Sequence, residues 1–198
     1  MHLRLPFTTI LALLTTLPFT TSTPTMGFIG CSMAENTAQG YIAVGGQRMW
    51  GPYGTGGLVV QSWTNTSSPS WQLFDAQAAK YGLPTAVWVQ FCIYADPGIT
   101  YDEAKLLIAN ARHHAALGAV IYVTGQPGYE DGGVCARAGA DGPNITAAMA
   151  KRATEDGGLN VTWPGEFRLK KGEVLDDGCH ANAAGLEALG KQAVAFWG

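Results

Sequence analysis

The sequence has few charged residues and no cluster of basic ones. Charged side chains make up 14% of the 198 residues, and the formal net charge is −3. There is no basic patch and no aromatic RNA-binding motif, so the composition argues against nucleic acid as a partner. No repeat of fixed period is visible either. We therefore expect one compact domain with a sizeable hydrophobic core.

The residues that usually bind metals or phosphates also lack the necessary spacing. The four cysteines do not have the spacing of a zinc site. The glycine cluster from Gly51 to Gly57 lacks the lysine and the spacing of a phosphate-binding loop, and it reads as a flexible connection. We expect neither a metal nor a cofactor.

One hydrophobic run has the character of a targeting segment. Arg4 precedes an apolar region from Phe7 to Phe19, and Thr-Ser-Thr-Pro-Thr follows. This predicts a secretory signal peptide over residues 1–25, cleaved near Thr25. A membrane anchor is the alternative, but the run is short and rich in threonine, so we expect no stable membrane insertion. Without this segment, 11 basic residues (12 minus Arg4) face 15 acidic ones, a net charge of about −4.

Secretion would also account for the cysteines. An even number of cysteines in an oxidising compartment favours two disulfides, for which three connectivities are possible. Three Asn-x-Ser/Thr triplets fit an extracellular glycoprotein, at Asn65, Asn144 and Asn160.

Short apolar runs alternate with helical stretches along the rest of the chain. This alternation predicts parallel strands joined by helical crossovers, and hence a three-layer α/β/α sandwich over residues 26–198. We expect strands over residues 27–31, 58–63, 86–94, 119–124 and 160–163, and helices over residues 36–47, 69–81, 101–118, 143–156 and 182–197.

The chemistry-bearing residues lie at the two ends of the mature chain. Asp177 precedes His180 by three residues, a spacing that lets a carboxylate orient an imidazole. Ser32 follows the first expected strand and is the best-framed candidate nucleophile. Both segments follow the carboxyl ends of strands, where ligands bind in parallel sheets, so we expect them on one face.

These residues resemble the SGNH (GDSL-like) hydrolase family. Gly30-Cys31-Ser32 is similar to the family's first block, Gly-Asp-Ser, with cysteine in place of aspartate. The segment from Asp177 to Gly185 is similar to its last block, an Asp-x-x-His turn. The resemblance implies a flavodoxin-like five-stranded parallel sheet in the order 2-1-3-4-5. It also implies that Ser32 is the nucleophile, His180 the base and then the acid, and Asp177 the residue that orients His180.

The middle of the chain departs from the family pattern. The family has an oxyanion-binding glycine after its second strand and Gly-x-Asn after its third, whereas this chain has Thr64-Asn65-Thr66-Ser67 and Cys92-Ile93-Tyr94. The backbone N–H of Ser32 is the one oxyanion donor that carries over. As substitutes for the missing donors we considered Asn65, Gln90 and Tyr94.

The implied strand order also bears on the disulfides. It makes the first and third strands neighbours, about 4.8 Å apart, which is within reach of a disulfide between Cys31 and Cys92. The remaining pair, Cys135 and Cys179, would then fix the loop that carries His180.

The resemblance implies a secreted serine ester hydrolase that works through an acyl-enzyme. A carbohydrate acetyl ester is the preferred substrate, because the chain is secreted, acidic and rich in tryptophan; Trp50 and Trp163 could stack on sugars. A lipase or lysophospholipase is a further possibility. The alternative class is a non-catalytic secreted carbohydrate-binding or interaction protein on the same scaffold. We expect a monomer.

Overall fold

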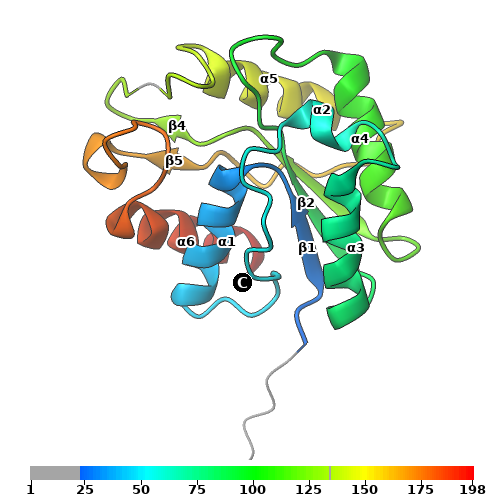
Figure 1. Ribbon diagram of the computed structural model, residues 1–198. Coiled ribbons are helices and arrows are strands. Elements are labelled where there is room, and N and C mark those ends of the chain that lie inside the picture. The colour runs from blue at the N-terminus through cyan, green and yellow to red at the C-terminus, as the bar shows by residue number, and fades with distance from the viewer. Residues whose placement is uncertain (1–22, 134) are drawn as a thin grey trace, which may run out of the picture.

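A computed structural model describes residues 23–133 and 135–198; the predicted signal peptide, residues 1–25, lies outside this part of the chain except for its last three residues. The protein has an α/β fold in which helices cover both faces of a parallel sheet (Figure 1). In chain order the elements are β1 (Met26–Ile29), α1 (Ser32–Ala43), α2 (Val60–Trp63), α3 (Pro69–Tyr81), β2 (Ala86–Gln90), α4 (Tyr101–His113), β3 (Val120–Thr124), β4 (Gly128–Tyr129), α5 (Gly142–Glu155), β5 (Arg168–Leu169), the 3₁₀ helix η1 (Lys171–Glu173) and α6 (Ala183–Trp197).

The central sheet contains three strands in the order β1-β2-β3, all parallel. Beyond each outer strand the pairing continues through one residue: Met49 bridges Met26 on β1, and Thr162 bridges Tyr122 on β3. The short strands β4 and β5 form a separate parallel pair. The coarse α/β class is therefore as expected, but the described residues do not form a continuous five-stranded sheet.

The expected strand over residues 58–63 is wrong. Val60–Trp63 forms the short helix α2, and the place beside β1 belongs to Met49, which we had expected to lie outside any strand. The backbone N–H of Val60 donates to the carbonyl of Cys92 (2.9 Å), so this segment packs across the end of β2 instead of joining the sheet. The weak strand expected over residues 160–163 is reduced to the single bridge at Thr162.

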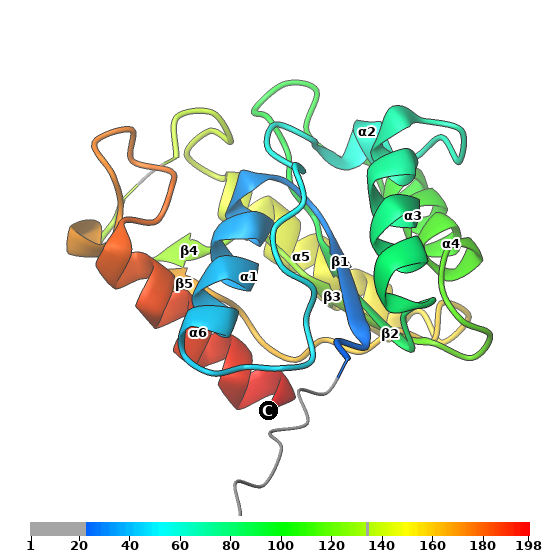
Figure 2. The same cartoon turned by 60° about the horizontal axis from the view of Figure 1, so that its bottom comes forward.

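Side chains on the two faces of the sheet belong to two separate hydrophobic clusters, as strand alternation requires. Val87, Val89 and their neighbours pack against α3, α4 and α5, while Phe28 and Trp88 on the other face pack against α1 and α6. Figure 2 shows α1 and α6 side by side on one side of the sheet and α3 and α4 on the other. The helices therefore form the two outer layers of the sandwich.

Two glycines allow α1 and α6 to pack unusually closely. A Cβ added at Gly40 would lie 1.9 Å from the carbonyl oxygen of Leu186, and one at Gly190 would lie 2.3 Å from that of Gly40. The missing side chain of Gly40 is what permits the contact. The contact matters for the candidate site because α1 begins at Ser32 and α6 begins just after His180.

The two tryptophans considered as sugar platforms have different environments. Trp50 is completely buried and packs against Phe74 and Tyr53, so its interpretation as an exposed platform is wrong. Trp163 is half-buried, with the ammonium of Lys151 4.8 Å from its ring centre. Within residues 23–133 and 135–198, none of the helices combines the length and apolar character needed to span a bilayer.

Candidate active site

Ser32 is the first residue of α1, directly after the turn that leaves β1. At this position the backbone N–H has no acceptor within the helix, so it is free to donate to a ligand. The helix dipole adds a partial positive charge at the same place. This position arises because the buried strand β1 is followed by only Gly30 and Cys31 before α1 begins.

His180 and Asp177 lie in the loop between η1 and α6. One carboxylate oxygen of Asp177 accepts the backbone N–H groups of Cys179 (2.9 Å) and His180 (3.0 Å), and the other oxygen bonds the Nδ1 atom of the His180 ring. Asn36 on α1 accepts the backbone N–H of Ala181 (3.1 Å). The carboxylate thus fixes both the ring and the turn, and α1 holds the turn from the other side.

The fold brings these three residues together from opposite ends of the chain. The Oγ atom of Ser32 lies 2.7 Å from the Nε2 atom of His180, and Asp177 bonds the opposite ring nitrogen. An imidazole held in this way can take the serine proton with Nε2 while the carboxylate stabilises the charge that develops on the ring. The arrangement has the geometry of a serine nucleophile activated by a histidine base.

The charge state of Asp177 is well defined. The hydrogen bond from His180, assisted by the N–H groups of Cys179 and His180, lowers the pKa of Asp177 to about 2, although partial burial opposes this effect. Tyr129 lies nearby and donates its hydroxyl to the carbonyl of Cys179 (3.2 Å). Burial, with a smaller contribution from the Asp177 charge, raises the pKa of Tyr129 to about 12. Asp177 is therefore ionised at neutral pH, whereas Tyr129 stays protonated.

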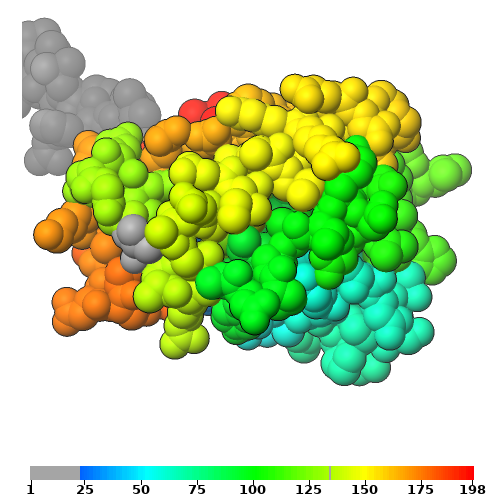
Figure 3. Space-filling model, turned by 90° about the horizontal axis from the view of Figure 1, so that it is seen from above, coloured from blue at the N-terminus to red at the C-terminus, as the bar shows by residue number. Residues whose placement is uncertain are grey.

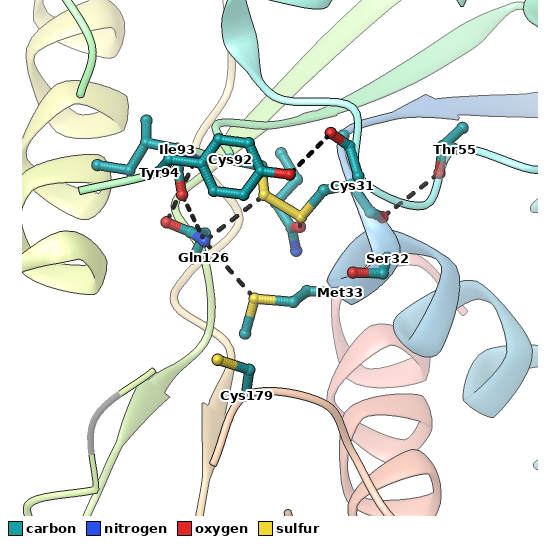
Figure 4. The surroundings of a disulfide bond; sticks show 12 residues. Cys31, Ser32, Met33, Thr55, Cys92, Ile93, Tyr94, Gln126 and Cys179 are labelled. Atoms are coloured by element: carbon teal, nitrogen blue, oxygen red, sulfur yellow. Dashed lines mark hydrogen bonds between the residues drawn. A yellow bond between two sulfur atoms is a disulfide. The ribbon is translucent and has the colours of Figure 1, made fainter. Parts of the chain in front are cut away.

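Both disulfides pair as we expected from the sequence. Cys31 is joined to Cys92 and Cys135 to Cys179, which gives Cα–Cα distances of 5.9 Å and 4.5 Å. Figure 4 shows the first of them, with Ser32 on the adjoining turn. Ser32 directly follows Cys31, and His180 directly follows Cys179. Each of the two candidate catalytic side chains therefore stands next to a covalent cross-link.

A glycine turn near Ser32 offers two unpaired backbone donors. The turn runs from Thr55 to Leu58, closed by a hydrogen bond from the Leu58 N–H to the Thr55 carbonyl (3.0 Å). Gly57 has a positive φ of 79°, a conformation that favours glycine at this place in a turn. Within the described residues the N–H groups of Gly56 and Gly57 have no acceptor, and both residues line the cavity beside Ser32.

Glu35, one turn along α1 from Ser32, anchors this glycine turn. Its Oε1 atom accepts the backbone N–H groups of Tyr53 (3.0 Å), Gly54 (2.5 Å) and Thr55 (2.7 Å). The Thr55 hydroxyl donates to the carbonyl of Cys31 (3.4 Å), which Figure 4 also shows. A single helix thus carries the candidate nucleophile and the carboxylate that positions the turn opposite it.

The cavity at this site has a volume of about 270 Å³. Apart from Ser32 and His180, its walls come from both disulfides, the glycine turn and several loop side chains. The lining residues are Cys31, Ser32, Met33, Gly56, Gly57, Val59, Cys92, Ile93, Tyr94, Gln126, Cys135, Arg137, Cys179 and His180. The cavity is small compared with pockets for drug-sized ligands, which range from about 300 to 1,000 Å³.

The three side chains considered as oxyanion donors occupy different places. Tyr94 lines the cavity, but its hydroxyl donates to the carbonyl of Gly57 (3.3 Å). Gln90 is buried against Cys31 outside the cavity lining, and its Nε2 atom has no partner among the described residues. Asn65 is exposed and belongs to a different surface hollow, with Gln61 and Leu73. Of the three, Tyr94 alone lines the cavity.

The structure adds three groups that sequence reasoning missed. Gln126 is buried after β3, and its amide nitrogen lies near the Cys92 sulfur (3.5 Å) and the Met33 sulfur (3.6 Å), as Figure 4 shows. Arg137 reaches the cavity from the long loop after β4, and Gly56 and Gly57 line it from the other side. None belongs to a recognisable local motif, because each depends on long-range packing.

The other predicted modification and ligand sites can be located as well. Asn65, Asn144 and Asn160 are all exposed, so glycosylation at each stays a prediction that the structure permits. In the part of the chain that the structure describes, no three His, Cys, Asp or Glu side chains lie close enough together to hold a metal ion.

The fold and the site together define an α/β scaffold, with helices on both faces of a parallel sheet, that carries a Ser–His–Asp arrangement at the carboxyl edge of the sheet. No family model and no curated protein matches the chain. A solved structure that it resembles is named "a putative SGNH hydrolase from Slackia heliotrinireducens". The two share 17% identity with a TM-score of 0.60, over 89% of this chain and 100% of the other. At this identity the likeness shows the fold alone, and it agrees with the coarse α/β class that the resemblance of the two terminal blocks implies.

Proposed function

We propose that this protein is a secreted serine ester hydrolase of the SGNH type. The observation that supports this most strongly is the short contact of 2.7 Å between the Ser32 Oγ and the His180 Nε2, with Asp177 bonded to the other ring nitrogen. Ser32 attacks the ester carbonyl while His180 takes its proton. The alcohol then leaves with that proton, and water hydrolyses the acyl-enzyme by the same route.

The oxyanion that forms during attack needs donors, and the glycine and asparagine that usually supply them in the family are missing here. In this proposal the N–H of Ser32 supplies one donor and the N–H of Gly56 or Gly57 another. Losing a single such donor typically costs about 3 to 4 kcal/mol of transition-state stabilisation, so a replacement is needed for efficient catalysis. The unpaired N–H groups of the glycine turn support this assignment.

The small cavity favours a short acyl group, and an acetyl ester of a carbohydrate is the proposed substrate. A cavity of about 270 Å³ leaves little room for a long acyl chain, which weighs against a lipase or lysophospholipase. The export signal predicted from residues 1–25 and the two disulfides fit an extracellular enzyme.

A fluorophosphonate probe tests the nucleophile directly. We expect it to label the wild-type protein and the Ser62→Ala control, which removes a serine outside the cavity. It should not label Ser32→Ala, and His180→Ala should label far more slowly. Thermal unfolding of each variant checks that it is folded. A well-folded wild type that the probe does not label would favour the non-catalytic binding protein instead.

The acyl preference can be measured with p-nitrophenyl esters of increasing chain length. We expect kcat/KM to be highest for the acetate and to fall as the chain becomes longer than the cavity. Acetate release from acetylated polysaccharides then identifies the alcohol side. A preference for octanoate over acetate would contradict the carbohydrate esterase assignment and favour a lipase.

A further inference from the structure

Arg137 is the one side chain with a permanent charge among the described residues that line the Ser32 cavity. The other lining groups are glycines, the two disulfides, apolar side chains, and the neutral polar groups of Ser32, Tyr94 and Gln126. His180, which is titratable, also lines the cavity. No acidic residue belongs to the lining. A ligand bound next to Ser32 would therefore face a single cation with no lining carboxylate to neutralise it.

The side chain of Arg137 also lacks a partner within the described part of the protein. The other described arginines each have one: Arg48 donates to the Trp197 carbonyl (3.0 Å), Arg112 donates to two carbonyls, Arg152 lies over the Tyr101 ring, and Arg168 pairs with Glu166. Arg137 is exposed, and its side chain makes no hydrogen bond or ion pair with residues 23–133 or 135–198. Its five N–H donors thus stay available to a ligand.

The backbone holds Arg137 in a defined place relative to His180. The carbonyl of Arg137 accepts the Ala95 N–H (2.8 Å), and a turn from Cys135 to Ala138 encloses it, closed by a hydrogen bond of 3.0 Å. The disulfide from Cys135 leads to Cys179, the neighbour of His180. In Figure 3, which views the molecule from above, this loop is yellow-green and lies between the orange loop that precedes α6 and a green part of the chain. One cross-link therefore connects the arginine-bearing turn to the histidine-bearing turn.

We propose that Arg137 binds an anionic group on the substrate, so that the preferred esters carry a carboxylate close to the scissile bond. This inference rests on the esterase function proposed above. A guanidinium matches a carboxylate through two parallel N–H···O bonds, and this pairing is stronger than a neutral hydrogen bond. The carboxylate can belong to the alcohol, as in an acetylated uronic acid, or to the acyl group, as in a monoester of a dicarboxylic acid.

Two matched substrate pairs test this proposal and distinguish the two sources of the charge. The alcohol side is tested with O-acetylated methyl galacturonoside against its neutral methyl ester, and the acyl side with mono-p-nitrophenyl adipate against its methyl ester. We expect the wild type to prefer the charged member of at least one pair by about tenfold in kcat/KM, as a charge-assisted hydrogen bond implies. The pair that shows the preference identifies where the carboxylate sits.

Variants of Arg137 then assign the preference to this residue. Arg137→Ala should remove the preference for the charged ester, and Arg137→Lys should keep part of it. Lys191→Ala removes the same charge from a surface ion pair on α6, so it serves as the control for net charge and should keep the preference.

The outcomes that would overturn the proposal can be separated from failure of the esterase assignment. If Ser32 is labelled by the fluorophosphonate and the neutral esters are hydrolysed, but neither charged ester is preferred, the role of Arg137 is refuted while the esterase function stands. A preference that survives in Arg137→Ala also refutes it. If no ester is hydrolysed and Ser32 is not labelled, the proposed function itself has failed.

Discussion

Replacing Glu35 should slow the reaction without any contact between this residue and the substrate. Its Oε1 atom holds three consecutive N–H groups of the loop from Tyr53 to Thr55, and the next two residues are the glycines that line the cavity. In Glu35→Ala these N–H groups lose their acceptor, and the Gly56-Gly57 turn loses its fixed position opposite Ser32. In Glu35→Gln an amide oxygen can still accept, although more weakly.

The size of the effect follows from these contacts. A hydrogen bond to a charged acceptor contributes about 1.5 to 3 kcal/mol, but the N–H groups here are only partly buried and water can replace part of the loss. We expect Glu35→Ala to lower the free energy of unfolding by about 2 to 3 kcal/mol. Complete loss of one oxyanion donor reduces kcat by about 10²- to 10³-fold. In Glu35→Ala the turn is displaced but still present, so the fall in kcat should be smaller than this. We therefore expect kcat to fall about 10- to 100-fold.

The kinetic pattern distinguishes positioning of a donor from a general structural defect. Hydrogen bonds to the oxyanion form fully only in the transition state, so kcat for p-nitrophenyl acetate should fall while KM changes little. Glu35→Gln should lie between the wild type and Glu35→Ala. Glu187→Gln, which removes the charge of a surface ion pair on α6, is the matched control and should behave as wild type. If Glu35→Ala were destabilised but kept its kcat within about twofold, the assignment of the glycine turn as a donor would be refuted.

Two further predictions concern pH and packing. Because the pKa of Asp177 is lowered to about 2, its stabilising contacts are complete above its unfolded pKa of about 4 and are lost as the pH falls towards 2. A histidine base acts only in its neutral form, so kcat/KM should fall on acidification while Asp177 is still ionised; a rate unchanged down to about pH 4 would contradict a neutral histidine base. Gly40→Ala places a Cβ 1.9 Å from the Leu186 carbonyl oxygen and should lower the free energy of unfolding by about 1 to 3 kcal/mol or more, measured in urea. Gly157→Ala, which meets nothing within 4 Å, is the control, and equal losses in both variants would count against the close helix contact.

The parts of the fold that could be predicted are those with continuous local patterns. The runs that became β1, β2 and β3 are almost wholly apolar, as strands covered on both faces are. Helix α4 begins at Tyr101, where we expected a helix to begin, directly after a capping box formed by Thr100 and Glu103. The run from Leu58 to Trp63 begins with three apolar residues, but it forms a helical turn because its contacts are with Cys92 and Gly30, far away in the sequence. The edge bridges at Met49 and Thr162 involve one residue each and leave no periodic pattern.

The candidate site divides in the same way. Asp177 and His180 could be recognised because their contact is local, and Ser32 because it follows a buried strand; the cysteine pairing then depended on the implied strand order. Gly56, Gly57 and Arg137 could not be recognised, since the first two act through backbone N–H groups and the third reaches the cavity only through the fold. Trp50 was misjudged because its loop lies under Tyr53 and Phe74 and not at the surface.

The position of the cross-links has a practical consequence for anyone who produces this protein. Cys31 and Cys179 immediately precede Ser32 and His180, so both sulfur–sulfur bonds must exist before the two turns are tethered. Thiols stay reduced in an ordinary cytosol, so protein expressed there would lack both disulfides, and the segments that carry Ser32 and His180 would not be cross-linked. Material for assays should therefore come from an oxidising secretory route.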